Sequence, residues 1–202
     1  MSRTHAIPER PISDDRRARR NALVLSVAQA LFYVGAAIQV ATSGLIGHIL
    51  ADDKSLATLP VTAFVLGSLV TTVPASMFMR EVGRRFGFQL GATLGALSAL
   101  LATYAIYERS FWLFCFAIFV AGAYQAFAQY YRFAAADTAS EAFRPRAISW
   151  VLAGGLVAAV AGPQLVIYTK DALAPVTFAG VFVASAAASI MAIGILDRKA
   201  HV

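Results

Sequence analysis

Six long apolar runs constrain this chain more than any other feature of its sequence. They cover residues 22–50, 56–79, 88–107, 111–136, 147–169 and 173–196. Each run reaches the ~20 residues that a helix needs to cross the ~30 Å hydrocarbon core of a bilayer. Helices are favoured because lipid offers no partner for unpaired backbone groups. The sequence therefore predicts an all-α membrane protein with six transmembrane helices.

The composition fits a chain that lies mostly in lipid. Of its 202 residues, 59% are hydrophobic and 14% are charged, whereas soluble domains have ~45–50% apolar and ~25% charged residues. The single cysteine, Cys115, allows neither an internal disulfide nor a multi-cysteine metal site. The motifs of serine hydrolases, zinc proteases and P-loop proteins are missing. We therefore predict that the chain is not an enzyme and holds no cofactor or metal.

The basic residues predict how the chain is oriented in the membrane. Arginines fill the N-terminal tail, the 2–3 and 4–5 connections and the C-terminus, whereas the opposite side carries only Lys54, Arg109 and Lys170. The positive-inside rule then places both termini in the cytoplasm, with the bacterial inner membrane as the expected location. The charges meet anionic lipid head groups and are not expected to bind nucleic acid. The predicted parts are a basic cytoplasmic tail (1–21), a transmembrane domain (22–196) and a second cytoplasmic tail (197–202).

Polar side chains inside the predicted spans gather on the first and fourth helices. Gln29 and Tyr33 share one face of the first helix, and Gln125 and Gln129 share a face of the fourth with Arg132. Because polar groups in a membrane are costly and usually functional, we predict that the two glutamines of the fourth helix, with Gln29 and Tyr33, bind a solute in a cavity. The third and sixth helices would then face lipid. Hydrogen bonding of these glutamines to neighbouring helices is the alternative.

Arg132 lies near the cytoplasmic end of the fourth run and has two interpretations. The favoured one is an ion pair with Asp137 or Glu141 at the cytoplasmic edge, since a long side chain can reach the membrane surface. The other is a cation that faces the cavity and attracts an anionic solute. No Asp or Glu lies inside any apolar run, which weakens a proton-driven mechanism within these helices.

A short basic stretch, MFMREVGRRFGF (77–88), connects the second and third runs. We expect Gly83 to let the chain bend in a tight cytoplasmic turn. REVGRRFG resembles the loop 2–3 signature of the major facilitator superfamily, G-x-L-a-D-R-x-G-R-R, whose G-R-R matches Gly83, Arg84 and Arg85. The Asp of that signature falls on Arg80 and its first Arg on Glu81, so the acid–base order is swapped.

The resemblance implies a cytoplasmic gate built from charged residues at this end of the chain. The predicted gating residues are Arg80, Glu81, Arg84, Arg85, Arg132 and Asp137.

Two further stretches resemble the same family. GGLVAAVAGP (154–163) is similar to the helix 5 motif that ends in Gly-Pro, and AADTASEAFRPRAIS (135–149) is similar to the join between helices 4 and 5. The helix 4 motif keeps Gly122 but has Ile118 in place of its arginine. Independently of the family, GSLVTTV (67–73) and GGLVAAV (154–160) share Gly, Leu, Val and Val in register. Inverted three-helix repeats would explain this match, and chance recurrence of small residues is the alternative.

The resemblance implies half of a twelve-helix transporter, with six transmembrane helices arranged as two inverted three-helix repeats. A half of this kind leaves the polar sides of helices 1 and 4 uncovered. We therefore expect a half-size transporter that moves a small solute by alternating access, as a homodimer or with a second six-helix half. A non-transporting protein, such as a truncated relic, an assembly factor or a regulatory subunit, is the alternative.

Met77 and Met79 raise the possibility of copper, because thioethers bind Cu(I). Methionines in membrane helices mostly serve packing, and we predict no metal site here.

Overall fold

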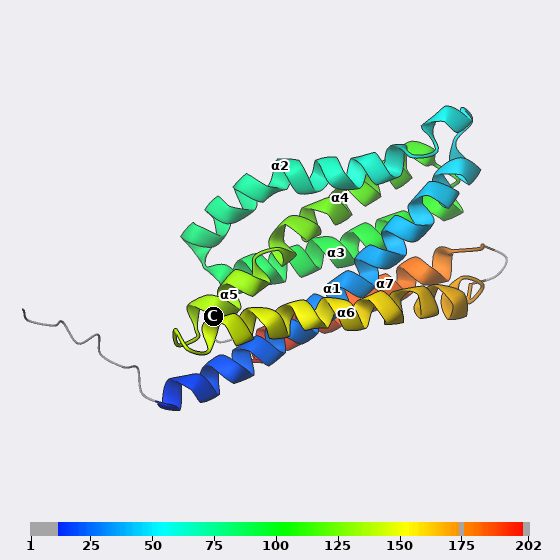
Figure 1. Cartoon of the computed structure of the whole chain (residues 1–202). Coiled ribbons are helices and arrows are strands. Elements are labelled where there is room, and N and C mark those ends of the chain that lie inside the picture. Colours follow the sequence, from blue (N-terminus) through cyan, green and yellow to red (C-terminus); the bar gives the residue numbers. More distant parts are fainter. Residues whose placement is uncertain (1–11, 174–175, 200–202) are drawn as a thin grey trace, which may run out of the picture.

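A computed structural model describes residues 12–173 and 176–199 (Figure 1). The described part consists of helices and their connections, and six helical spans are long and apolar enough to cross a membrane. The predicted all-α fold with six spans is therefore confirmed. The elements are α1 (Ile12–Leu50), the short 3-10 helix η1 (Lys54–Leu56), α2 (Leu59–Val82), α3 (Arg84–Tyr107), α4 (Phe111–Ala128), α5 (Tyr131–Asp137), α6 (Arg144–Thr169) and α7 (Ala179–Lys199).

Two helix boundaries differ from the expected ones. The first helix begins at Ile12, so part of the predicted N-terminal tail is helical. The connection between α2 and α3 is shorter than the stretch 77–88, because α2 continues through Val82 and α3 begins at Arg84. Gly83 alone leaves the helical path, with φ 97° and ψ 152°. Glycine adopts this positive φ at no steric cost, so a single residue is enough to reverse the chain.

The helices pack as two related sets of three. Helix α2 lies along α4, and α6 lies along α1 in the same way (Figure 1). Likewise, α3 packs on α4, and α7 packs on α1. The helices α3 and α7 also contact each other. If α1, α2 and α3 are exchanged with α4, α6 and α7 in that order, each of these contacts becomes another contact of the same set. The packing thus has the two-repeat pattern that the family resemblance implies.

The repeated sequence stretches have a structural counterpart in two glycine contacts. A Cβ atom added to Gly67 of α2 would lie 2.0 Å from the carbonyl oxygen of Phe119 in α4. A Cβ atom added to Gly154 of α6 would lie 2.2 Å from the carbonyl oxygen of Ser26 in α1. These are the first residues of GSLVTTV and GGLVAAV. The match between the two stretches therefore has a packing cause, since both glycines let a helix backbone approach its partner.

Side chains hold the connection between α1 and α2 at the opposite end of the bundle from Gly83. Lys54 donates hydrogen bonds through Nζ to the carbonyl oxygens of His48 and Ala51, at 2.8 and 2.7 Å. These carbonyls belong to the C-terminal end of α1, where a cation is favourable. The backbone N–H of Ser55 donates to Asp53, and this hydrogen bond lowers the pKa of the Asp53 carboxyl.

We predict that Gly67→Ala and Gly154→Ala each lower the free energy of unfolding by about 1–3 kcal/mol, because the added methyl group overpacks a backbone contact. Thermal unfolding in detergent checks this. Gly194→Ala is the matched control, since a Cβ atom there meets nothing within 4 Å. The control is expected to be neutral or slightly stabilising, because alanine favours helix over glycine by about 1 kcal/mol. Equal effects at all three positions would contradict the packing account.

Candidate solute-binding face and cytoplasmic gate

Four helices form a continuous face of the bundle. The contacts run from α2 to α4, from α4 to α1 and from α1 to α6, and α3 and α7 pack behind α4 and α1 (Figure 1). The central helices of this face are α1 and α4, which carry the polar residues predicted to bind a solute. We call Gln29, Tyr33, Gln125 and Gln129 the polar strip.

Contacts on the two sides of α4 and of the turn that follows it show where the strip opens. Toward α2, the hydroxyl of Tyr130 donates a hydrogen bond to the carbonyl oxygen of Thr72 at 3.2 Å. Toward α1, the ring of Tyr124 meets that of Phe32 edge-on, with centroids 4.8 Å apart. Residues of α4 that point between these two contacts face the space between α1 and α2.

Gln125 and Gln129 occupy this intermediate position on the helix. Gln125 is half-buried and Gln129 is exposed. The regular α-helix is interrupted beside them, because α4 ends at Ala128 and α5 begins at Tyr131, although both residues in between keep right-handed helical dihedral angles. Irregular backbone at membrane depth is tolerated where it is buried in protein or lines a cavity.

The contribution of α1 to the strip is less accessible. Gln29 is only 5% exposed, and Tyr33 is half-buried, with its ring against Gly155 of α6. One turn before Gln29, Ser26 donates a hydrogen bond to the carbonyl oxygen of Trp150 at 2.6 Å. On the α1 side, Ser26 and Tyr33 are therefore covered in part by α6, and Gln129, just after α4, is the most exposed residue of the strip.

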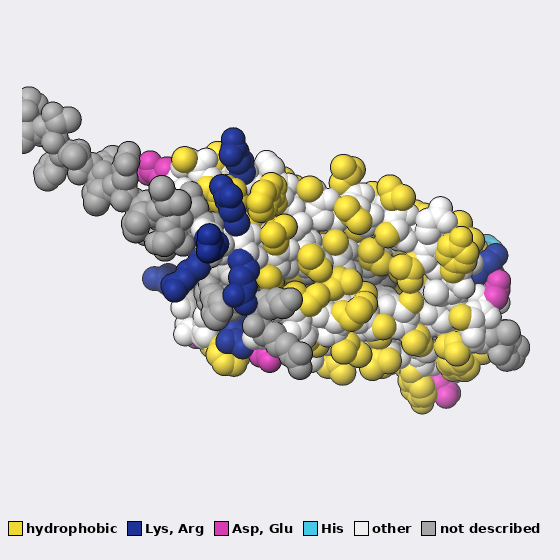
Figure 2. All heavy atoms as spheres, turned by 90° about the horizontal axis from the view of Figure 1, so that it is seen from below, with side chains coloured by type: hydrophobic (Ala, Val, Ile, Leu, Met, Phe, Trp, Pro, Cys, Tyr) yellow, Lys and Arg dark blue, Asp and Glu magenta, His cyan; other side chains and the backbone are white. Residues whose placement is uncertain are grey.

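Two exposed apolar walls flank the polar strip. Only 11% of the most apolar part of the span that contains α2, and 22% of that of α6, is buried, whereas the share is at least half in every other span. The walls consist of equivalent positions in the two repeats: Leu69, Val70 and Val73 on α2, and Leu156, Val157 and Val160 on α6. Figure 2 shows apolar side chains spread over the face that it views, with most of the visible arginine and lysine side chains gathered at one end.

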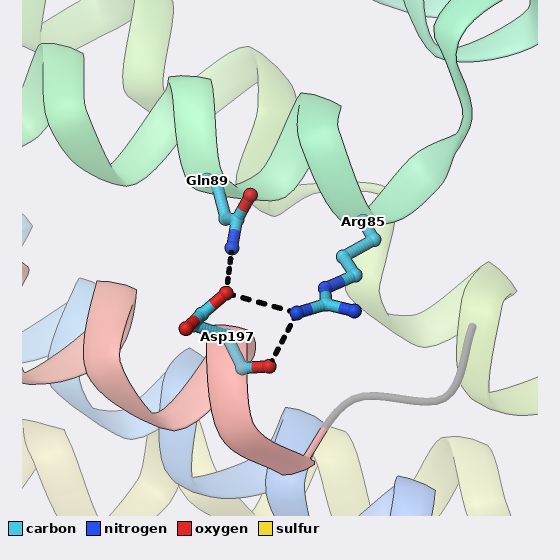
Figure 3. Close-up of polar contacts among 3 residues, drawn as sticks. All are labelled: Arg85, Gln89 and Asp197. Carbon is cyan, nitrogen blue, oxygen red and sulfur yellow. Dashed lines mark hydrogen bonds and ion pairs between the residues drawn. The ribbon is translucent and has the colours of Figure 1, made fainter.

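Two neighbouring arginines anchor the start of α3 at this basic end. Arg84 forms an ion pair with Asp137 of α5 at 2.5 Å. Arg85 forms an ion pair with Asp197 of α7 at 2.9 Å and also donates to the Asp197 carbonyl oxygen (Figure 3). Gln89 donates to the same carboxylate at 3.0 Å. The sequence-based prediction missed Asp197 and Gln89. The signal for Asp197 is that it is an acidic residue next to the basic residues Arg198 and Lys199.

The ion pair expected for Arg132 was wrong. Asp137 pairs with Arg84, and Arg132 takes part in no ion pair within residues 12–173 and 176–199. Its guanidinium carbon instead lies 4.9 Å from the centroid of the Phe133 ring. The remaining predicted gating residues, Arg80 and Glu81, are exposed at the end of α2.

The described residues offer little to a metal ion. Within them, no group of three or more His, Cys, Asp or Glu side chains is placed to hold one. Met79 is buried against Gly87, whereas Met77 is 61% exposed. Packing against Gly87 therefore explains the position of Met79.

A polar strip between two apolar walls, built from two three-helix repeats, is the arrangement of one half of a membrane transporter. The sequence model of the Major Facilitator Superfamily matches residues 25–201. The chain belongs to this family.

Three curated relatives have transporter names. The chain is 44% identical over 185 residues to the riboflavin transporter RfnT of Brucella anthropi, and this match covers 92% of the chain and 46% of that protein. It is 29% identical to the MFS-type transporter YdeG of Bacillus subtilis, over 86% of the chain and 41% of the relative. It is 26% identical to YddS of the same organism, over 90% and 42%. The chain thus spans about half the length of these relatives.

We predict that Arg84→Gln and Asp137→Asn each lower the free energy of unfolding by no more than about 1 kcal/mol, because both side chains are substantially exposed to solvent. The double variant should cost little more than either single one, since one interaction is lost in all three. Denaturation at low and high salt provides the measurement, and Arg17→Gln, a change to an exposed arginine, serves as the control. Additive losses would show that the two residues do not act as a pair.

Proposed function

We propose that this chain forms one half of a solute transporter and works by alternating access together with a second six-helix half. The observation that carries this proposal is the polar strip between two apolar walls. A bilayer would leave the exposed glutamine of this strip in an unfavourable environment. A second half that lies on the walls would instead enclose the strip in a shared watery cavity, the position of the solute site in transporters built from repeats.

The second half is either another copy of this chain or a different six-helix unit. The two walls present equivalent residues in the two repeats, so a partner with similar apolar ridges would meet both in the same way. The basic end is proposed to face the cytoplasm, as the positive-inside rule predicts.

The charged end would act as the gate. The pairs of Arg84 with Asp137 and of Arg85 with Asp197 connect α3 to both α5 and α7. Arg80 and Glu81 remain exposed on α2, next to the apolar wall, where charges of a second half would reach them. Forming and breaking such contacts would bias the two states of the transporter.

A flavin is the first solute to test. The 44% identical relative is named a riboflavin transporter, and the strip combines two accessible glutamines with Tyr33. Glutamine both donates and accepts hydrogen bonds, which suits the imide edge of a flavin ring, and tyrosine stacks on aromatic ligands.

Riboflavin uptake into liposomes that contain the purified chain tests the proposal. We expect saturable uptake, and we expect Gln125→Ala and Gln129→Ala each to lower it about 3–10-fold through the loss of a hydrogen bond. Thr93→Ala, a change to an exposed side chain of α3, should have no effect. Membrane insertion without uptake of riboflavin or other small solutes, both by the chain alone and together with any second half that cross-linking identifies, would favour the non-transporting alternative.

Cysteine cross-linking identifies what covers the walls. In a Cys115→Ala background, Val70→Cys and Val157→Cys should form cross-links in native membranes, whereas Leu97→Cys on α3, which is 56% exposed, should not. A product of twice the chain mass indicates a second copy, and a product of another mass indicates a different half. Cross-linking through Leu97→Cys alone would contradict the proposed interface.

A further inference from the structure

Arg132 lies inside a membrane span and forms an ion pair with no carboxylate of the described residues. It is the second residue of α5 and belongs to the span Phe111–Asp137. Asp137, which marks the paired charges of the basic end, lies five residues later, about 7 Å along a helix axis. Arg132 is therefore more than one helical turn deeper than the ion pair between Asp137 and Arg84.

The side chain lacks the partners that other arginines of this end have. Arg132 is half-buried, and its Nε atom is buried without a hydrogen-bond partner in the described part of the chain. Arg84 and Arg85 have carboxylates. Arg17 and Arg146 are exposed, so water can solvate them. The cation–π contact with Phe133 is the only interaction of the Arg132 guanidinium within residues 12–173 and 176–199.

An unpaired charge in this position is costly, because a low-dielectric environment penalises a charge that has no partner. A guanidinium also offers five N–H donors in a fork that matches carboxylate and phosphate oxygens. The free Nε–H of Arg132 belongs to this fork. An anionic ligand group would supply the missing charge and the missing acceptors together.

The polar strip gives such a ligand a route to Arg132. Residues 125, 129 and 132 are spaced four and three apart, and the two residues between α4 and α5 keep right-handed helical dihedral angles. Their side chains therefore lie on about the same side of the chain. Gln125 and Gln129 border the space between α1 and α2, and Gln129 is exposed. A solute that contacts these two glutamines is thereby brought close to the arginine.

We propose that Arg132 binds an anionic group of the transported solute, such as a phosphate or a carboxylate. This inference rests on the proposed transport function and narrows the solute to an anion. For flavins, it means that a phosphorylated flavin binds in preference to uncharged riboflavin.

Ligand-dependent thermal stability of the full chain in nanodiscs of phosphatidylcholine tests this inference, with flavin mononucleotide and riboflavin as the probes. We expect flavin mononucleotide to bind at least about 10-fold more tightly than riboflavin. Arg132→Gln should weaken flavin mononucleotide binding about 10–100-fold, the usual range for a charged hydrogen-bonding partner, and leave riboflavin binding almost unchanged. Arg132→Lys should retain part of the preference, because it keeps the charge but loses the fork. Arg146→Gln should bind both probes like the unmodified chain.

Three results would overturn the inference. The first is that the two flavins bind equally tightly and that Arg132→Gln changes neither affinity. In that case the chain could still transport riboflavin, so the proposed function would not be contradicted. The second is that flavin mononucleotide does not raise the melting temperature of the unmodified chain. Nanodiscs of phosphatidylglycerol provide the third result. If this anionic lipid stabilises the unmodified chain but not Arg132→Gln, and abolishes the effect of flavin mononucleotide, then a lipid phosphate is the partner of Arg132.

Discussion

The close backbone contacts at Gly67 and Gly154 are the interaction on which the rest of this structure depends. Helices in lipid gain little from hydrophobic burial against one another, so their association relies on close packing of small residues. Gly67 brings α2 onto α4, and Gly154 brings α6 onto α1. These two contacts put α1 and α4 in the middle of one face and leave little of the most apolar parts of α2 and α6 buried. The polar strip and its apolar walls follow from this arrangement.

The number of spans and the repeat were predictable from the sequence, because both depend on local patterns of apolar and small residues. The break between α4 and α5 was not, since neither Gln129 nor Tyr130 is a helix breaker by itself. Tyr130 is held there by a hydrogen bond to Thr72 of α2, a contact that no local pattern encodes. The partial burial of Tyr33 has a similar cause, because its ring packs against Gly155 of α6.

The pairing of charges at the basic end was the least predictable feature. The prediction paired Arg132 with Asp137 or Glu141, because Arg132 lies near the cytoplasmic end of its run and its long side chain can reach the membrane surface. The structure instead pairs Asp137 with Arg84, which precedes it by 53 positions, since 137 − 84 = 53. Arg85 reaches Asp197, 112 positions away. Two adjacent arginines thus tie the start of α3 to two helices of the other repeat, α5 and α7. Both of these carboxylates are taken by α3, and in our proposal the counter-charge of Arg132 comes from a ligand.

The central claim is that the strip side of α4 faces a watery space while α3 and α7 face lipid. Cysteine accessibility to a charged, membrane-impermeant thiol reagent measures this directly. In a Cys115→Ala background, the labelling rates of Gln125→Cys and Gln129→Cys are compared with those of Leu97→Cys and Ile190→Cys. The account predicts fast labelling at the two glutamine positions and very slow labelling at the other two, whose side chains are exposed on the bundle surface but would lie against acyl chains. Equally slow labelling at all four positions would show that no aqueous cavity borders the strip.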